Sequence, residues 1–170
     1  MHVTLEQKIS SLFRMDEETW ARHANPLSVW TRNTVLPFLI LAFWSRVWLG
    51  WWALVPVAGA LIWMWVNPRL FSRPESTDNW ASRAVLGERV WANRDRDPVP
   101  EYHRKVPNIL SAVSGTGFLF VIWGVYALEI WPTVFGVTVV YLGKLWFLDR
   151  MVWLYLDVKD SQTPRHGNDS

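Results

Sequence analysis

The apolar stretch at residues 33–66 constrains the fold of this chain most strongly. It reads NTVLPFLILAFWSRVWLG followed by WWALVPVAGALIWMWV, and its only formal charge is Arg46, near the middle. A membrane-spanning helix needs roughly 20 apolar residues, with about 17 as the lower limit, so this stretch is too long for one span and long enough for two short ones. Tryptophans at positions 44, 48, 51 and 52 flank Arg46, and tryptophan belts are typical of the membrane–water boundary. The sequence therefore predicts a hairpin with spans over about 33–48 and 51–66.

A second apolar stretch follows at residues 107–157. It predicts one span over about 108–128 and another over about 131–148, separated by a break near Trp131-Pro132. Ser111 and Gly115 form a small-xxx-small pair in the first of these spans, which favours close helix packing; Ser114, Gly117 and Gly124 add further positions of this kind. We therefore expect an all-α polytopic membrane protein with four transmembrane helices in two hairpins.

The charged residues lie between the apolar stretches rather than within them. Apolar residues make up 51% of the chain, yet its mean hydropathy is only +0.06, and this separation into blocks distinguishes a membrane protein from a soluble one of equal average hydrophobicity. The absence of cysteine excludes disulfides, thiolate metal sites and cysteine nucleophiles.

Five segments follow from this pattern. Residues 1–32 form a cytoplasmic N-terminal segment, with an amphipathic helix expected over 4–14 and a short helix over 16–24 that ends before Asn25-Pro26. Residues 33–66 form the first hairpin. Residues 67–106 form a cytoplasmic loop with an interfacial amphipathic helix over 78–94. The second hairpin covers 107–157, and 158–170 are expected to be a disordered tail.

Lysine and arginine predict the orientation. The N-terminal segment holds four of them and the central loop holds eight, whereas the turns between predicted spans hold Arg46 alone. The positive-inside rule therefore predicts a multi-pass protein of the inner or plasma membrane with both termini and the central loop in the cytoplasm. The expected partners are the lipid bilayer and anionic lipids at its cytoplasmic face. The arginines of the loop alternate with Asp and Glu and form no nucleic-acid motif, so no nucleic acid is expected.

Glu88 is the first candidate for a functional residue. On a helical wheel of residues 78–94 it lies in the middle of an apolar arc; the arc consists of Trp80, Ala81, Ala84, Val85, Trp91 and Ala92. A carboxylate at the centre of a buried face is costly unless it is paired or protonated. We expect a cationic partner on the cytoplasmic side; the candidates are Arg22, His23, Arg32, Lys144 and Arg150. Glu88 is then either an interfacial ion pair or a general acid/base.

The last predicted span contributes three more charged residues. Lys144 lies in its apolar part, about two turns from the cytoplasmic end, and ionisable residues inside a membrane are functional candidates by default. Its long stem also allows it to snorkel to the interface. Asp149 and Arg150 follow at the interface, where Asp149 is expected to meet another helix.

No established site motif is present. His23, Glu88, His103 and Asp149 could together surround a metal, but the chain has no HxxxH or HxxE spacing, so no metal site is predicted and no cofactor is identified. There is likewise no GxSxG, P-loop or GxGxxG motif.

Four segments carry a resemblance to a known family: TWARHANPLSVWTR, NPRLF, NWASRAVLGERVW and GKLWFLDRMVWLY. They lie between residues 19 and 155 and together resemble a small family of bacterial and archaeal integral membrane proteins of unknown function. The resemblance implies a compact helical membrane domain and brings no catalytic residue with it.

The candidate site is therefore a polar cluster at the cytoplasmic face. Its catalytic candidates are Glu88, His23 and Asp149. Its binding candidates are Asn25, Arg32, Asn79, Arg89, Lys144 and Arg150. Three functions fit this pattern. The first is a non-catalytic scaffold, assembly or regulatory protein with a protein partner or a second copy of the chain. The second is a small membrane enzyme or lipid-handling protein, with a water-reachable pocket and a raised carboxylate pKa at Glu88. The third is an oligomeric transporter.

Overall fold

The computed structural model describes residues 17–94 and 99–162, and every regular element in these ranges is helical. The helix predicted for residues 4–14 lies outside the described residues. The elements are α2 (Glu17–His23), α3 (Pro26–Asn33), α4 (Val35–Trp44), α5 (Arg46–Leu49), η1 (Gly50–Ala53), α6 (Leu54–Leu70), α7 (Trp80–Ala92), η2 (Glu101–His103), α8 (Lys105–Ala127) and α9 (Ile130–Gln162).

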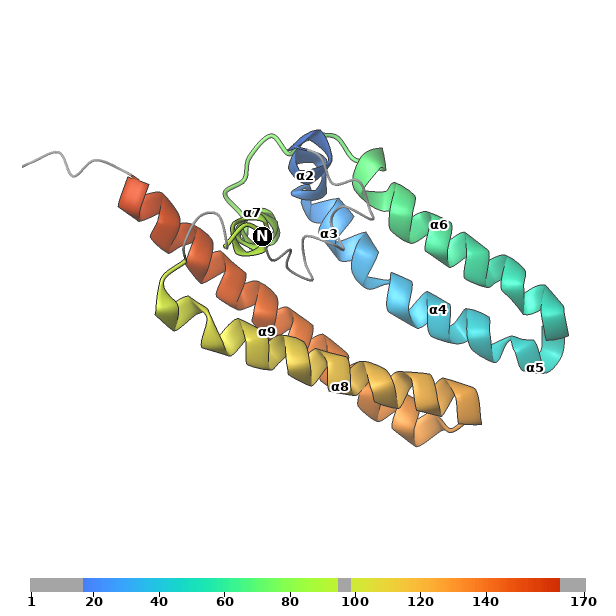
Figure 1. The fold of residues 1–170 in the computed structure, drawn as a ribbon. Helices are drawn as coiled ribbons and strands as arrows, with labels where there is room; N and C mark the ends of the chain where they lie inside the picture. Colours follow the sequence, from blue (N-terminus) through green and yellow to red (C-terminus); the bar gives the residue numbers. More distant parts are fainter. Residues whose placement is uncertain (1–16, 95–98, 163–170) are drawn as a thin grey trace, which may run out of the picture.

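Three helical segments, rather than the four predicted, are long and apolar enough to cross a membrane: Pro26–Leu70, Glu101–Ala127 and Ile130–Ser161. The first is a run of helices that folds back on itself at α5 and η1 (Figure 1). Its leg α4 has 10 residues, well below the lower limit of about 17 for a span, and α6 has 17 residues, of which Asn67, Pro68 and Arg69 at its end are not apolar. The prediction of two hairpins is confirmed in arrangement, whereas the count of four separate spanning helices is wrong.

The turn of the first hairpin is fixed by one glycine and one arginine. Gly50 adopts a positive φ of 53°, a backbone conformation that costs glycine little. Arg46 donates from Nη2 to the carbonyl oxygens of Val125 and Tyr126, at 2.7 and 2.8 Å. These carbonyls belong to the last turn of α8, where no intrahelical donor is left to bond them. The two hairpins are thereby joined at the end where both make their turns (Figure 1).

Helices α8 and α9 pack along a line of small residues. A Cβ added to Gly124 would lie 2.6 Å from the Thr133 nitrogen, and one added to Gly136 would lie 2.6 Å from the Gly117 oxygen. The two backbones therefore approach closely, as small residues allow. The predicted roles of Gly117 and Gly124 are confirmed. The Ser111–Gly115 pair, by contrast, faces away from α9 and is exposed, because it lies on the opposite side of α8.

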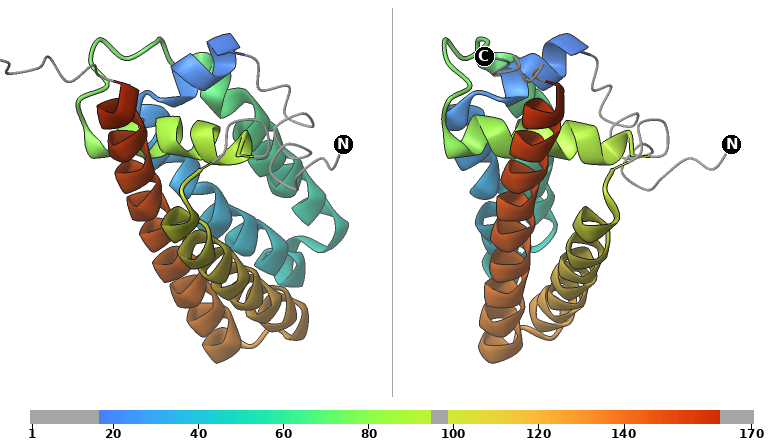
Figure 2. Two further views of the ribbon diagram at one scale, coloured as in Figure 1. Left: turned by 60° about the vertical axis from the view of Figure 1, so that its left-hand side comes forward. Right: turned by 90° about the vertical axis from the view of Figure 1, so that its left-hand side faces the viewer.

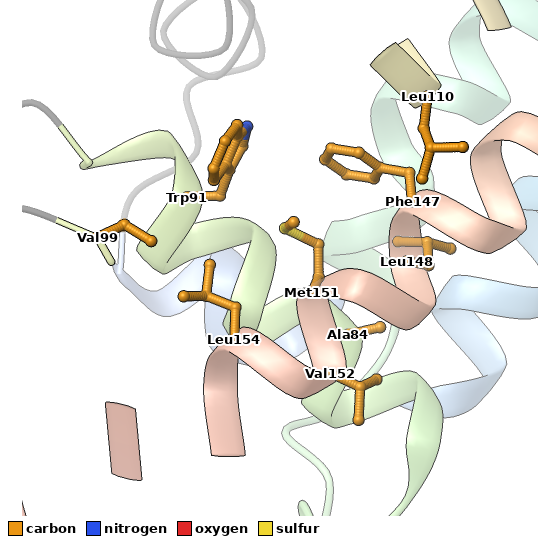
Figure 3. Packing of buried hydrophobic residues seen from close by; sticks show 9 residues of the cluster. All are labelled: Ala84, Trp91, Val99, Leu110, Phe147, Leu148, Met151, Val152 and Leu154. Carbon is orange, nitrogen blue, oxygen red and sulfur yellow. The ribbon is translucent and has the colours of Figure 1, made fainter. Parts of the chain in front are cut away.

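Helix α7 lies across α9 rather than along it (Figure 2). The crossing point is Gly87, where an added Cβ would lie 1.9 Å from the carbonyl oxygen of Met151. Around this crossing is the largest apolar cluster of the described residues (Figure 3): Ala84, Trp91, Val99, Leu110, Phe147, Leu148, Met151, Val152 and Leu154. A second cluster of Ala24, Val29, Ala81 and Val85 joins the opposite side of α7 to α2 and α3. Helix α7 is therefore packed between the two hairpins.

Three element boundaries differ from the prediction. Asn25-Pro26 begins a helix rather than only ending one, because the Asn25 side chain accepts from the backbone nitrogen of Leu27 at the N-terminus of α3. Helix α6 runs past Asn67-Pro68 to Leu70, with both residues fully buried. Helix α9 continues to Gln162, so residues 158–162 are helical instead of belonging to a disordered tail; residues 163–170 lie outside the described part.

Candidate functional site

Glu88 is ion-paired with Lys144. The Lys144 Nζ donates to the Glu88 Oε1 at 2.5 Å, with the Glu88 side chain 21% exposed and that of Lys144 43% exposed. The crossing of α7 and α9 positions the pair, since each residue lies close to the crossing on its own helix. Of the five predicted partners of Glu88, Lys144 is the one that forms the ion pair. The carboxylate of Glu88 therefore balances the positive charge of Lys144 in the apolar part of α9.

The pKa of Glu88 is lowered, not raised. Burial by itself raises the pKa of this carboxyl, but nearby positive charge, above all the charge and hydrogen bond of Lys144, outweighs that effect. Glu88 is therefore held as a carboxylate. A general acid at neutral pH needs the opposite shift, so this environment disfavours that role.

His23 lies next to this pair in a buried chain of hydrogen bonds. Its side chain reaches Arg32 Nη1 from Nε2 at 3.3 Å and Ser28 Oγ from Nδ1 at 3.0 Å. Ser28 Oγ then donates to Asn67 Oδ1 at 3.0 Å, and Asn67 Nδ2 donates to Thr31 Oγ1 at 2.7 Å. The last hydrogen bond of the series runs from the Thr31 hydroxyl to the backbone carbonyl oxygen of Leu27 in the same helix, at 2.6 Å. The residues come from α2, α3 and α6, so these bonds fasten three helices together.

The donor and acceptor roles in this series of hydrogen bonds determine the tautomer of His23. A guanidinium has only donors, so Arg32 donates and the Nε2 of His23 accepts. The proton of the neutral ring is then on Nδ1, where it is donated to Ser28. Burial lowers the pKa of His23 to about 3, and the nearby charge of Arg32 lowers it in the same direction. Both ring nitrogens of a neutral imidazole are thus occupied, and neither lone pair nor proton is left for acid–base chemistry.

Ser28, Thr31, Asn67 and Ser82 were missed as site residues by the sequence analysis. Ser28, Asn67 and Ser82 are fully buried, and Ser82 donates from Oγ to the carbonyl oxygen of Ala24 at 2.6 Å. Small polar residues near helix ends are usual in capping roles, so local pattern gives them no special weight. The one available signal was Asn67, an amide directly after an apolar stretch.

Asn25 and Asn79 act as helix caps. Asn79 accepts from the backbone nitrogen of Ser82 at 2.9 Å at the start of α7. The amide nitrogen of Asn25 donates to the carbonyl oxygen of Ser72 at 3.1 Å, which ties α3 to the segment after α6. The side-chain amides of both residues are engaged in these hydrogen bonds.

The remaining predicted residues lie at the edge of the cluster. Arg89 pairs with Glu17, on an exposed face. Asp149 receives a long hydrogen bond from Trp80 Nε1 at 3.5 Å and contacts Arg150 at 3.3 Å, which confirms the expectation that it meets another helix. The structure therefore brings together His23, Arg32, Glu88 and Lys144, and leaves the other candidates peripheral.

Within the described residues no group of three or more His, Cys, Asp or Glu side chains is placed to hold a metal ion. His103, predicted above as a possible metal ligand, lies in η2. Its Nε2 is 2.7 Å from Asp157 Oδ2 of α9, and the Tyr102 hydroxyl donates to the same oxygen at 3.1 Å. This contact is distant in sequence from Glu88 and ties η2 to α9.

Two apolar grooves lie along the first hairpin, away from Glu88. One, of about 610 Å³, runs between α4 and α6, and the other, of about 340 Å³, lies between α4 and α8. Many large apolar side chains on α4, α6, α8 and α9 are exposed, with Trp48, Trp51 and Trp131 at 77%, 87% and 80%. An exposed apolar surface of this extent is compatible with a membrane protein.

Residues 4–169 match a family of unknown function, DUF6653, and the chain belongs to that family. No curated protein and no solved structure matches the chain.

Proposed function

We propose that this protein is an integral membrane protein with a non-catalytic role, as a scaffold or assembly factor for a membrane partner or for a second copy of itself. The observation that carries the proposal is the closed contact between Glu88 and Lys144. The pKa of Glu88 is lowered, and His23 is neutral with both ring nitrogens hydrogen-bonded. These properties suit residues that hold helices together, and they are the reverse of what a general acid or base needs.

The location is the inner or plasma membrane. In the proposed orientation α2, α7 and the end of α9 face the cytoplasm, and the turns at α5 and between α8 and α9 face the other side. The support is the concentration of Lys and Arg at the first end and the exposed tryptophans at the second. The hydrogen bond from Arg46 to the last turn of α8 supports this orientation, because it keeps the turn at α5 and η1 beside the C-terminal end of α8, at the same side of the membrane. Anionic lipids at the cytoplasmic face are the expected lipid partners.

An introduced cysteine tests the orientation, because the chain has none of its own. Trp51→Cys and Trp131→Cys replace exposed side chains at the two turns, and Ser76→Cys places a thiol in the loop before α7. We expect a membrane-impermeant maleimide to label the first two in intact cells and the third only after the membrane is opened. Labelling of Ser76→Cys in intact cells contradicts the orientation.

A double-mutant cycle tests the structural role of the pair. Glu88→Gln removes the carboxylate partner of Lys144, and we expect a loss of about 2 kcal/mol of unfolding free energy in detergent, within the range for charged hydrogen bonds. Lys144→Met leaves the more buried Glu88 carboxylate without its partner and should cost at least as much, about 2–3 kcal/mol. The double variant should cost less than the sum of the two. Arg83→Gln breaks the exposed pair with Asp78 and serves as the control, with an expected change below about 0.5 kcal/mol.

The second candidate, a small membrane enzyme or lipid-handling protein at this site, makes the opposite prediction. Under it, Glu88→Gln leaves stability unchanged and abolishes the phenotype of the host strain. Under the scaffold proposal, the phenotype of the Glu88→Gln strain follows the amount of folded protein, and it recovers when expression is raised. The transporter alternative is disfavoured because Lys144, the predicted charge inside the last span, is neutralised by Glu88.

A further inference from the structure

Polar contacts join the two hairpins at the end where both make their turns. Arg46 donates from Nη2 to the backbone carbonyl oxygens of Val125 and Tyr126 at the last turn of α8. The tryptophans around these turns are exposed, with Trp51 at 87% and Trp131 at 80%. Exposed tryptophans of this kind are typical of a membrane–water boundary, so this first level of polar contacts marks one edge of the apolar surface.

A second level of polar contacts lies at the opposite end of the apolar helices. Asn67 of α6 donates from Nδ2 to the Thr31 hydroxyl of α3 at 2.7 Å. The Tyr141 hydroxyl of α9 donates to the backbone carbonyl oxygen of Asn33, two positions after Thr31. These two contacts keep the polar residues of α3, α6 and α9 at one level of the molecule.

The ion pair of Lys144 and Glu88 lies at this second level. Lys144 follows Tyr141 by three positions, which is less than one helical turn. The Lys144 side chain is 43% exposed, and its Nζ is held at 2.5 Å from the Glu88 Oε1. A lysine held in this way is not free to extend its stem toward a distant interface, as unpaired lysines do. The pair therefore fixes the level at which α9 meets water.

The two levels are equally far apart on three separate runs of the chain. The runs are residues 33–46, 54–67 and 131–144. Thirteen positions separate the ends of each run, and no residue between the ends is charged. At 1.5 Å per residue each run is about 20 Å long. The hydrocarbon core of a typical bilayer is about 30 Å thick, so the apolar belt between the two levels is about 10 Å too short for it.

Helix α8 has a longer apolar run, which its inclination accommodates. Residues 106–128 carry no charge and extend over about 33 Å of helix. Toward the end that bears α7, α8 leans away from α9 (Figure 2), and a tilted helix covers less of the bilayer thickness than its own length. Tilt of the other helices likewise only shortens their rise, so about 20 Å is an upper value for the height of the belt.

We propose that the lipid surface this protein fits is a thin bilayer, with a hydrocarbon core of about 20 Å around the belt. A core of ordinary thickness would surround the ion pair of Lys144 and Glu88 with hydrocarbon, where charged groups are costly. It would also cover the Arg69 guanidinium, which lies over the Trp65 ring at 4.1 Å, two positions after Asn67. The inference rests on the proposed membrane insertion and adds the kind of bilayer: short acyl chains match the belt, and longer ones have to thin around it.

Thermal unfolding in vesicles of three phosphatidylcholines tests this inference. Dimyristoleoyl, dioleoyl and dierucoyl chains each carry one cis double bond and increase in length in this order, so the bilayer thickness rises while the head group stays the same. We expect the highest Tm in the dimyristoleoyl bilayer and a Tm about 5 °C lower in the dierucoyl bilayer, because hydrophobic mismatch destabilises the inserted protein. An equal Tm in all three lipids, or a higher Tm in either of the longer ones, overturns the proposal.

Labelling of introduced cysteines measures the height of the belt on α9. Trp146→Cys and Trp153→Cys replace side chains that are 59% and 53% exposed, and they lie about 22 and 33 Å from Trp131 along the helix. Thr138→Cys, at another exposed position, lies in the middle of the belt. In opened cell membranes we expect a water-soluble maleimide to label Trp146→Cys nearly as fast as Trp153→Cys, and Thr138→Cys at least about tenfold more slowly, because hydrocarbon excludes the charged reagent.

The same series has a clear contrary result. If Trp146→Cys is labelled as slowly as Thr138→Cys, the hydrocarbon core has its ordinary thickness at this helix and the proposal is overturned. Leu145→Cys, one position earlier, repeats the measurement if Trp146→Cys does not fold.

Carbonate extraction of the wild type separates this inference from the proposed location. A protein that carbonate removes from membranes is not inserted, and then both the location and the thin-bilayer inference fail. A protein that resists carbonate but unfolds at the same temperature in all three lipids supports the location and overturns the inference alone.

Discussion

The buried state of His23 predicts a specific dependence of stability on pH. Its pKa is about 3 in the folded protein and about 6.5 in an unfolded chain. Between these two values the unfolded state binds a proton that the folded state does not bind. Stability therefore falls as the pH falls below 6.5, by about 1.4 kcal/mol for each pH unit. From pH 7.5 to pH 5 the expected loss is about 2 kcal/mol, because only the 1.5 units below 6.5 contribute.

The test compares the wild type with His23→Gln. Glutamine can accept from Arg32 and donate to Ser28 in a similar way but carries no proton that titrates, so the slope between pH 5 and pH 6.5 should disappear even if the variant is less stable throughout. The assay is thermal unfolding in detergent, followed by circular dichroism at several pH values. For a chain of this size 2 kcal/mol corresponds to a shift in Tm of roughly 4–8 °C.

Two comparisons separate this effect from others. The lowered pKa of Glu88 means that its stabilisation is complete above the unfolded pKa of about 4.3 and is lost only as the pH falls below it, outside the measured interval. His103→Gln removes the contact with Asp157 and should leave the difference between wild type and His23→Gln in place. If His23→Gln has the same slope as the wild type, His23 is not held neutral in a buried network and the reasoning is refuted.

Two further substitutions test the packing that positions the site. Gly87→Ala places a Cβ against the carbonyl oxygen of Met151 and should cost about 2–3 kcal/mol in unfolding free energy through overpacking, whereas Gly115→Ala, which meets nothing, should be neutral or gain up to about 1 kcal/mol; equal effects at the two glycines would contradict the close crossing of α7 and α9. Arg46→Gln removes a charge-assisted donor from the end of α8 and should cost about 1–2 kcal/mol, with faster hydrogen exchange confined to the turns that Arg46 joins; unchanged exchange there argues against the link between hairpins.

Local pattern was sufficient to predict the helices and the buried face of α7. The apolar arc predicted on the wheel is confirmed, with Ala84 at 0%, Val85 at 1% and Trp91 at 1% exposure. Amphipathic spacing is a property of the segment itself, so it can be recognised without knowledge of what the face packs against. The position of Glu88 within that face was predicted for the same reason.

The ion-pair partner of Glu88 could not be predicted from the local sequence pattern. Five cations were compatible with Glu88, and the close crossing at Gly87 decided for Lys144. Ser28 and Asn67 are 39 positions apart and become neighbours only when α3 lies against the end of α6. Their burial follows from that packing, since an isolated helix end would leave both side chains in water.

The sequence alone determined that the chain is helical, that its apolar segments form two hairpins and where charge is concentrated, because these depend on composition and on spacing along one segment. Tertiary structure decided the rest. The first apolar stretch is one folded-back run, Arg46 caps α8, His23 is hydrogen-bonded to Arg32, and Glu88 is ion-paired with Lys144. These depend on which helix surfaces meet, and a hydrogen bond or ion pair between distant segments forms only where close backbone approach brings its two groups within reach.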